Sequence, residues 1–486
     1  MKWVEVRRGA YHDSVTLMRV SRQVGELAGV DGAMAAMGTR LNLEMLARMG
    51  FEAPGDAGPA DLVVAVSADG EALDAARRTL DDLLASAGAG PAGNRSGAVP
   101  GTLPPARTTG AAARRADAGI ALVSVPGPYV FPEAMDALAA GLNVMVFSDN
   151  VPLEQEIALK DAAARRGLIV MGPDCGTAVV GGAGLGFANA VRPGPVGLVA
   201  ASGTGAQQVM CLLDAAGVGV GHALGVGGRD LSLEVSGRSS LAALAALDAD
   251  PGTELIVLVS KPPAPQVADL VAEAARRLDT PVVFAFPGPE DDLTRATERA
   301  LRRLGRPVPE WPRWPAAPPA RPVTGALRGL FSGGTLRDEA EAIASTAPGG
   351  RTGGRTARGH ELIDYGDDAY TRGRAHPMID PTLRLEAIAK QSADPACGVL
   401  LLDVVLGYGA DPDPAASLAP AIVAALDRRD DLAVVVSLCG TPADPQGRDA
   451  QAEALRAAGA SVFASNAEAA RYAAGLRAGE GTGADG

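Results

Sequence analysis

The chain has 486 residues, of which 47% are hydrophobic and only 3% aromatic, and it carries a net charge of −13. This charge argues against binding to nucleic acid or to an anionic membrane surface, and no apolar run reaches the roughly 20 residues of a membrane span. The polar first residues predict no signal peptide, so we expect a cytoplasmic protein. Its four cysteines form no CxxC pair, so we expect reduced thiols and no metal site.

The first 190 residues alternate strand and helix patterns around one linker. Residues 1–86 predict a small α/β module of strands and amphipathic helices. A linker rich in Gly, Pro and Ala follows at 87–111. It contains a G-x-G-x-x-G spacing, which we discount because no strand precedes it and no helix follows it. At 112–190, continuous apolar strands between helices predict a Rossmann-like domain with a parallel sheet covered on both faces.

The remainder of the chain contains an internal duplication. Residues 195–310 and 325–480 repeat one strand–turn–helix plan, and "GALRGLFSGGT" in the second copy matches "VGLVAASGTGA" in the first. A Pro-rich linker at 311–324 joins the copies, and the second copy carries an insertion at 351–380 that is dense in titratable groups. Self-similarity at this scale predicts two domains of one α/β fold.

Each copy has a Ser/Gly/Thr turn between a buried strand and a helix. The first turn of a helix exposes unpaired amides and partial positive charge, and glycine lets an anion approach closely. The two turns are therefore predicted to bind phosphate, although ordinary capping by Ser or Thr is the alternative. The residues concerned are Ser202, Gly203, Thr204, Gly205, Ser332, Gly333, Gly334 and Thr335. Neither turn is a Walker A loop, because no Gly-Lys-Ser/Thr occurs in the chain.

Several motifs resemble the α subunit of succinyl-CoA synthetase: "GPDC" at 172–175, the Ser-Gly-Thr-Gly turn, and "GVGG" ahead of "DADPGTELIVLV". The chain is similar over nearly its whole length to the FdrA family, including "GAYHDSVTLM" and "GHELIDYGDDAYTRGRAHPMID". The resemblance implies a multidomain α/β protein with a CoA-binding-type domain at 112–190 and two flavodoxin-like, succinyl-CoA-synthetase-type domains. It also implies partner subunits, and CoA as a candidate cofactor.

Two departures from the synthetases affect the functional prediction. The region "FAFPGPEDDLTRATER", where those enzymes phosphorylate a histidine, contains none, and nothing in the chain supplies an ATP-grasp domain. The resemblance to the FdrA family implies a subunit of a heteromeric carbamoyltransferase, acting on carbamoyl phosphate and oxamate in allantoin and purine-nitrogen breakdown, and because of these two departures we expect this function. An ADP-forming acyl-CoA synthetase that works with a separate ATP-grasp subunit is one alternative, and a non-catalytic scaffold subunit is the other.

A few further residues are candidates for the site. Asp174 and Cys175 follow a parallel strand, where open α/β sheets bind ligands, although a turn-forming Asp beside a buried Cys is the alternative. Within the insertion, His360, His376 and Arg374 are predicted to act as acid–base or substrate-binding groups. The alternative for this segment is a solvated loop that contacts a partner subunit.

Overall fold

The computed structural model describes residues 1–476 with the exception of 11, 13, 53, 89–105, 347–350, 353–354, 357–358 and 372–373. Contacts divide the chain into two units. Unit 1 comprises Met1–Pro105 and Gly366–Asp380, and unit 2 comprises Ala106–Tyr365 and Pro381–Gly486. Most of the linker predicted at 87–111 lies outside the described residues. Within them, no helix has both the length and the apolar character needed to cross a bilayer.

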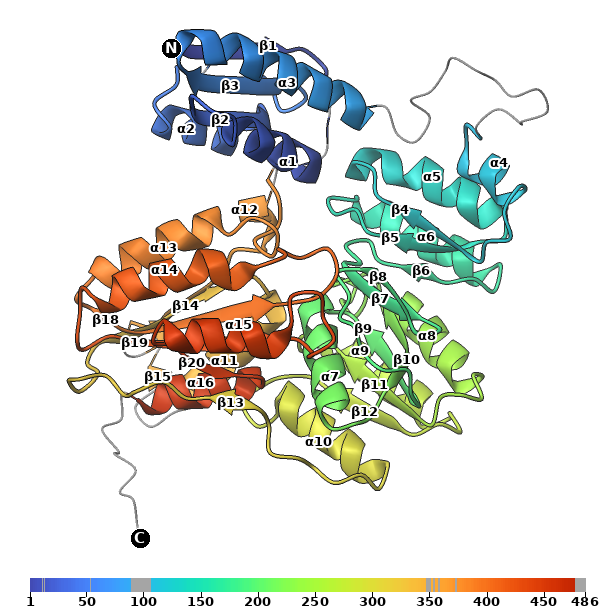
Figure 1. Ribbon diagram of the computed structural model, residues 1–486. Coiled ribbons are helices and arrows are strands. Elements are labelled where there is room, and N and C mark those ends of the chain that lie inside the picture. Colours follow the sequence, from blue (N-terminus) through green and yellow to red (C-terminus); the bar gives the residue numbers. More distant parts are fainter. Residues whose placement is uncertain are drawn as a thin grey trace. The chain divides into compact units, whose positions relative to one another are not determined.

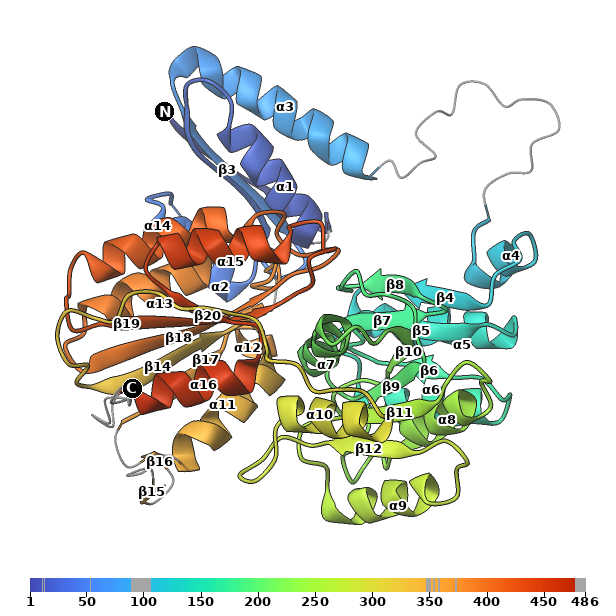
Figure 2. The same ribbon diagram turned by 60° about the horizontal axis from the view of Figure 1, so that its bottom comes forward.

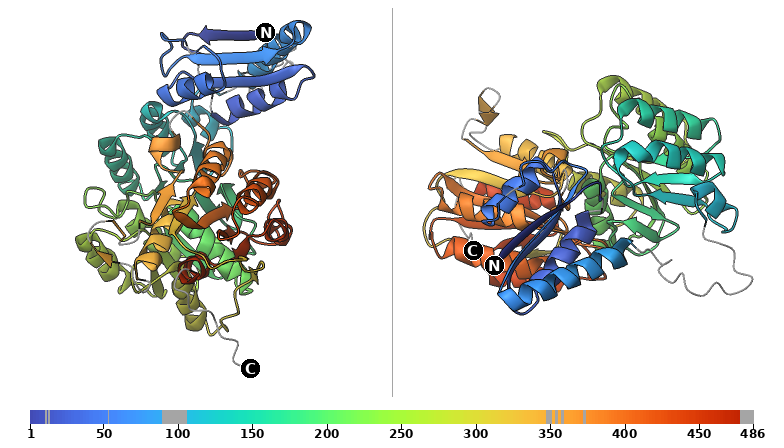
Figure 3. Two further views of the ribbon diagram at one scale, coloured as in Figure 1. Left: turned by 90° about the vertical axis from the view of Figure 1, so that its left-hand side faces the viewer. Right: turned by 90° about the horizontal axis from the view of Figure 1, so that it is seen from above.

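Unit 1 is built on an antiparallel sheet in the order β1–β3–β2, whose strands lie side by side in Figure 3. Alternate residues of the central strand enter two small cores, with Val64 and Val66 on one face and Val63 and Ala65 on the other. A strand covered on both faces is apolar at nearly every position, which explains the run "LVVAVSA", whose one polar residue, Ser67, is partly exposed. The elements are β1 (Lys2–Arg7), α1 (Ser14–Gly25), β2 (Val30–Met37), α2 (Arg40–Arg48), β3 (Leu62–Ala68), α3 (Gly70–Gly88) and α12 (Asp368–Thr371).

Unit 2 begins with a parallel sheet in the order β4–β5–β6. Its core is made of small aliphatic side chains such as Val130, Val144 and Leu159, as expected for a chain with few aromatic residues. The elements are α4 (Thr109–Ala113), β4 (Ile120–Val123), α5 (Gly127–Ala139), β5 (Asn143–Val146), α6 (Leu153–Ala164) and β6 (Val170–Met171).

The second sheet of unit 2 has six strands in the order β12–β11–β9–β10–β7–β8 (Figure 1). The hairpin β7–β8 pairs antiparallel with β10, so residues 177–186 extend this sheet, although the sequence places them in the preceding domain. The elements are β7 (Thr177–Val180), β8 (Ala183–Gly186), β9 (Val196–Ala200), α7 (Gly203–Ala215), β10 (Val220–Gly225), α8 (Arg238–Asp248), β11 (Leu255–Val259), α9 (Pro265–Ala275), β12 (Val282–Ala285) and α10 (Leu293–Arg303).

The third sheet also has six strands, in the order β13–β20–β19–β18–β14–β17. Figure 2 shows α13, α14 and α15 over one face and α11 and α16 over the other. The elements are β13 (Arg313–Trp314), β14 (Ala326–Phe331), α11 (Gly334–Thr346), β15 (Arg351–Thr352), β16 (Arg355–Thr356), β17 (Glu361–Asp364), α13 (Thr382–Ala393), β18 (Cys397–Val405), α14 (Pro414–Leu426), β19 (Ala433–Cys439), α15 (Arg448–Ala457), β20 (Ser461–Phe463) and α16 (Asn466–Gly475).

These sheets confirm the predicted multidomain α/β class. The two six-stranded sheets have the same arrangement of four parallel strands. The order β12–β11–β9–β10 in the second sheet corresponds to β19–β18–β14–β17 in the third. The segment predicted as an insertion at 351–380 therefore contains β17, the counterpart of β10, and its last part, Gly366–Asp380, groups with unit 1. Likewise, the predicted linker at 311–324 contains β13, which pairs with β20. Both differences arise because a short strand gives little periodic signal.

Candidate functional site

The two Ser/Gly/Thr turns meet in space. Each follows the strand β9 or β14 and starts the helix α7 or α11, and these two helices contact each other. The hydroxyl of Ser202 donates to Thr335 Oγ1 at 2.6 Å and also accepts from the amide of Gly205 at 3.0 Å. A Cβ atom added to Gly333 would lie 2.7 Å from Thr204 Oγ1, so only glycine allows this approach. The structure thus brings residues 133 positions apart into one cluster.

The second turn is capped from within the protein. The carboxylate of Asp403 accepts from the amides of Ser332 and Gly333, at 2.8 and 2.9 Å, and from the Ser332 hydroxyl at 2.8 Å. Asp403 is fully buried and lies 3.2 Å from the guanidinium of Arg384. The prediction that Ser332 and Gly333 bind an external phosphate is corrected: an internal carboxylate occupies their donors.

Burial separates the eight residues that are predicted to bind phosphate into two groups. Gly203 is exposed, and Ser202, Thr204 and Gly334 are partly exposed, so these four can contact a ligand. The other four, Gly205, Ser332, Gly333 and Thr335, are buried. The open part of the cluster therefore lies mainly on the first turn, where the N-terminal amides of α7 supply partial positive charge.

The sequence analysis missed a charged group beside the open turns, Lys261. Its ammonium lies 3.0 Å from the position of a Cβ atom added to Gly334, and 3.2 Å from a carboxylate oxygen of Asp338. Asp364, at the end of β17, lies on the same side, with Oδ2 2.5 Å from that Cβ position. Two features of the sequence could have pointed to Lys261. It comes two residues after the apolar strand β11, and it is one of only four lysines in the chain.

Asp174 and Cys175 are neighbours in the chain but differ in exposure. Asp174 is exposed, whereas Cys175 is 2% exposed and burial raises the pKa of its thiol to about 12. A thiol of this pKa stays protonated at neutral pH and is a poor nucleophile. Two residues further on, the hydroxyl of Thr177 lies 3.5 Å from where a Cβ atom of Gly203 would be, so this segment borders the open turn.

The three candidates from the predicted insertion belong to different units. In unit 2, His360 precedes β17 and its Nδ1 accepts from the amide of Leu327, at the amino end of the parallel strands. The turns lie at the carboxyl end, so His360 is separated from them by the length of β14. His376 and Arg374 belong to unit 1, where His376 Nδ1 accepts from the amide of Met378.

Comparisons with known proteins identify parts of the chain. A family model described as CoA-ligase matches residues 330–476, and one described as the heavy metal-associated domain of AllF matches 1–99. In the part of the chain that the structure describes, no three His, Cys, Asp or Glu residues are grouped so that they could hold a metal ion.

The relatives are mainly ligase subunits. The chain is 35% identical to "Uncharacterized protein YahF" of Escherichia coli, over 95% of this chain and 96% of that protein. It is 29% identical to subunit alpha 2 of an ADP-forming succinate–CoA ligase of Archaeoglobus fulgidus, over 36% of this chain and 61% of that subunit. A malate–CoA ligase subunit alpha of Methylorubrum extorquens is 26% identical over 34% of this chain and 57% of that subunit.

A solved structure is similar to a large part of the chain. It is a dinucleotide-forming acetyl-coenzyme A synthetase 1 of Ca. Korarchaeum cryptofilum, 16% identical, matched over 79% of this chain and 88% of that chain with a TM-score of 0.30. The score is too low for a comparison of sites. The family model and the ligase relatives agree on a CoA-ligase-type scaffold.

Proposed function

Because this chain belongs to the family of the E. coli protein YahF and carries a CoA-ligase domain, we propose that it is the acyl-transfer subunit of a CoA-ligase-type enzyme. In this proposal, the phosphate group of an acyl phosphate binds at the junction of α7 and α11, and the acyl group passes to CoA. A separate subunit supplies the nucleotide chemistry. The relatives named as ligase subunits support this division.

The observation that carries the proposal is the contact of the two turns beside Lys261. Ser202 and Thr335 join the starts of α7 and α11 at 2.6 Å, and the Lys261 ammonium lies next to Gly334. The side chain of Lys261 is 49% exposed, so a ligand can reach it. An ammonium group and the free amides of a helix start are the usual partners of a phosphate group.

In the proposed reaction, the residues at the turns stabilise the phosphate as it leaves. When the acceptor thiolate attacks the acyl carbon, the bond from that carbon to the phosphate oxygen breaks and the phosphate leaves with the electron pair. Donors fixed at the developing charge lower the barrier, because they need no reorganisation during the reaction. Lys261, the amide of Gly203 and the hydroxyl of Thr204 are the residues of this chain proposed to bind the departing phosphate.

A second candidate is carbamoyl transfer, in which the donor is carbamoyl phosphate and the acceptor is an amide nitrogen, as in oxamate. The positions of the unit 2 histidines favour it over a phosphohistidine route. His222 Nδ1 accepts from the amide of Gly181 and His360 Nδ1 from that of Leu327, so neither lies at the turns. The resemblance to the FdrA family also favours it. Both candidates use the same phosphate site and differ in the acceptor.

The test is a phosphate-release assay on the chain purified together with its partner subunits. Acetyl phosphate and carbamoyl phosphate are the donors, and CoA and oxamate are the acceptors. Lys261→Met is expected to lower kcat/KM by about tenfold or more with an unchanged melting temperature, because a charge-assisted hydrogen bond of 1.5–3 kcal/mol is lost.

The matched control is Lys390→Met, an exposed lysine on α13, which should retain full activity. Release that depends on CoA supports the ligase-type reaction, and release that depends on oxamate supports carbamoyl transfer. If Lys261→Met retains full activity with every pair of donor and acceptor, the proposed site is wrong.

A further inference from the structure

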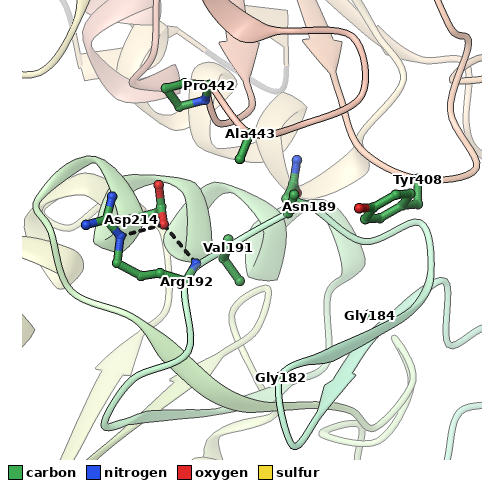
Figure 4. Close-up of a pocket in the computed structure, with 10 residues that line it drawn as sticks. Gly182, Gly184, Asn189, Val191, Arg192, Asp214, Tyr408, Pro442 and Ala443 are labelled. Atoms are coloured by element: carbon green, nitrogen blue, oxygen red, sulfur yellow. Dashed lines mark hydrogen bonds and ion pairs between the residues drawn. The ribbon is translucent and has the colours of Figure 1, made fainter.

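A cavity of about 700 Å³ lies at the other end of α7 from the turns (Figure 4). Its walls come from residues beside the second sheet of unit 2, among them Arg192 and Asp214, and from residues beside the third sheet, among them Tyr408 and Pro442. Because α7 rises about 1.5 Å per residue, Asp214 lies roughly 18 Å from Ser202 along the helix. The cavity is therefore separate from the proposed transfer site, and its volume falls within the ~300–1,000 Å³ usual for small-molecule sites.

One end of the cavity presents a guanidinium group held in place by a buried carboxylate. Arg192 donates to Asp214 Oδ1 from Nε at 2.9 Å and from its backbone amide at 3.0 Å. These bonds use neither Nη1 nor Nη2, and the side chain of Arg192 is 54% exposed. The hydrogen bond that Arg192 donates to the Asp214 carboxylate raises the pKa of Arg192, so the group keeps its charge. The Nη edge of a fixed guanidinium is suited to bidentate binding of a phosphate.

The other end of the cavity presents an aromatic ring. Tyr408 is 54% exposed, yet its backbone is fixed because its amide donates to the carbonyl of Ala188 at 2.8 Å. Figure 4 shows the ring on the side of the cavity away from Arg192, with Gly182 and Gly184 forming a wall without side chains below it. An exposed ring by itself is common on protein surfaces. An exposed ring on a held backbone and a guanidinium held by a carboxylate, at opposite ends of one cavity, are a combination that suits a specific ligand.

We infer that this cavity binds a nucleoside phosphate, with its planar base on the ring of Tyr408 and its phosphate on the guanidinium of Arg192. Among the described residues that line the cavity, Arg192 is the cation; its Nε is paired with Asp214, and its Nη atoms are the donors proposed to bind one phosphate group. The ligand is either a free nucleotide or the nucleotide part of CoA, which share this chemistry. This inference does not depend on the proposed transfer reaction.

The experiment is isothermal titration calorimetry on the full chain with AMP, adenosine, ribose 5-phosphate and CoA. AMP is expected to bind, and adenosine and ribose 5-phosphate to bind about tenfold more weakly, because each lacks one of the two contacts. Tyr408→Ala and Arg192→Gln should each weaken AMP binding by about tenfold or more, since stacking on an aromatic ring is worth ~1–3 kcal/mol.

The control is Tyr129→Ala, which removes another exposed tyrosine, on α5, and should leave AMP binding unchanged. If the cavity variants also weaken the binding of CoA, its nucleotide part is a ligand of this cavity. If they weaken only AMP binding, the ligand is the free nucleotide. The inference is overturned if AMP does not bind, or if its affinity is unchanged in Tyr408→Ala, a half-exposed position where truncation does not threaten the fold. Lys261→Met separates the two proposals, because it should not affect AMP binding.

Discussion

The two copies of the strand–turn–helix motif, β9–α7 and β14–α11, share one backbone plan. They differ in the group that accepts hydrogen bonds from the amides at the start of the helix. In the first, β9 pairs with β11 so that Ala200 lies opposite Val259, and the residue after Val259 is Ser260. In the second, β14 pairs with β18 so that Leu330 lies opposite Leu402, and the next residue is Asp403. The position that supplies the capping carboxylate Asp403 in the second copy is therefore occupied by a serine, Ser260, in the first.

This difference has an electrostatic reason. Two helix starts in contact bring like partial charges together. The Asp403 carboxylate neutralises the start of α11, where it also accepts two backbone amides. The start of α7 is capped by the Ser202 hydroxyl, a neutral group, which leaves its partial positive charge available to a ligand. A duplicated motif therefore does not imply a duplicated site.

The largest effect that tests this comparison is expected for Asp403→Ala. The change leaves the buried Arg384 guanidinium without the carboxylate that contacts it and removes the acceptor of two buried amides. Loss of one partner of a buried pair costs about 3–5 kcal/mol of unfolding free energy, which urea denaturation measures. As a control, Asp427→Ala, at an exposed position of the same domain, should cost less than about 0.5 kcal/mol. Equal costs would mean that Asp403 does not stabilise the second turn.

A second difference lies further along the two helices, where Glu339 of α11 corresponds to the buried Val209 of α7. Burial raises the pKa of Glu339 to about 7, although it accepts from the amide of Leu293 and the side-chain amide of Asn466. The folded state therefore holds this proton more tightly than the unfolded state, whose pKa is the ordinary 4.5. The stabilisation is complete below pH 4.5 and is lost as the pH rises through about 7.

We expect the unfolding free energy to fall by up to about 3 kcal/mol between pH 4.5 and pH 8, because each unit of pKa shift is worth 1.36 kcal/mol. Glu339→Gln should remove most of this slope, whereas Glu341→Gln, on the same helix at a half-exposed position, should keep it. Urea titrations at several pH values measure the slopes. A slope unchanged in Glu339→Gln would assign the pH dependence to other groups.

The smallest effects are expected from the two serines. Ser202→Ala removes both the cap on Gly205 and the bond to Thr335, at a cost of about 1–2 kcal/mol. Ser332→Ala removes one hydroxyl donor to Asp403, while the backbone amides keep their acceptor, so about 0.5–1 kcal/mol is expected. Melting curves of the two variants test the order. The reverse order would mean that the hydroxyl of Ser332, and not the carboxylate of Asp403, caps the second turn.

Much of the fold could be predicted from periodicity. Long apolar strands such as Leu255–Val259 and Cys397–Val405, followed by helices, indicate parallel sheets. The short strands β13 and β17 were missed, because two to four residues carry little pattern. Of the site, the two turns were found from their Ser, Gly and Thr residues. Lys261 and Asp403 were not, since each acts on a turn that is distant in the chain.

The sequence by itself determined the class of the fold, the duplication and the positions of both turns, because these depend on local periodicity and on the backbone preferences of glycine and serine. Only the tertiary structure decided which turn is open to a ligand. The capping carboxylate comes from a residue 71 positions after Ser332, and the bond that joins the turns spans 133 positions. Such contacts are set by strand order and register, which pair segments that local sequence patterns cannot relate.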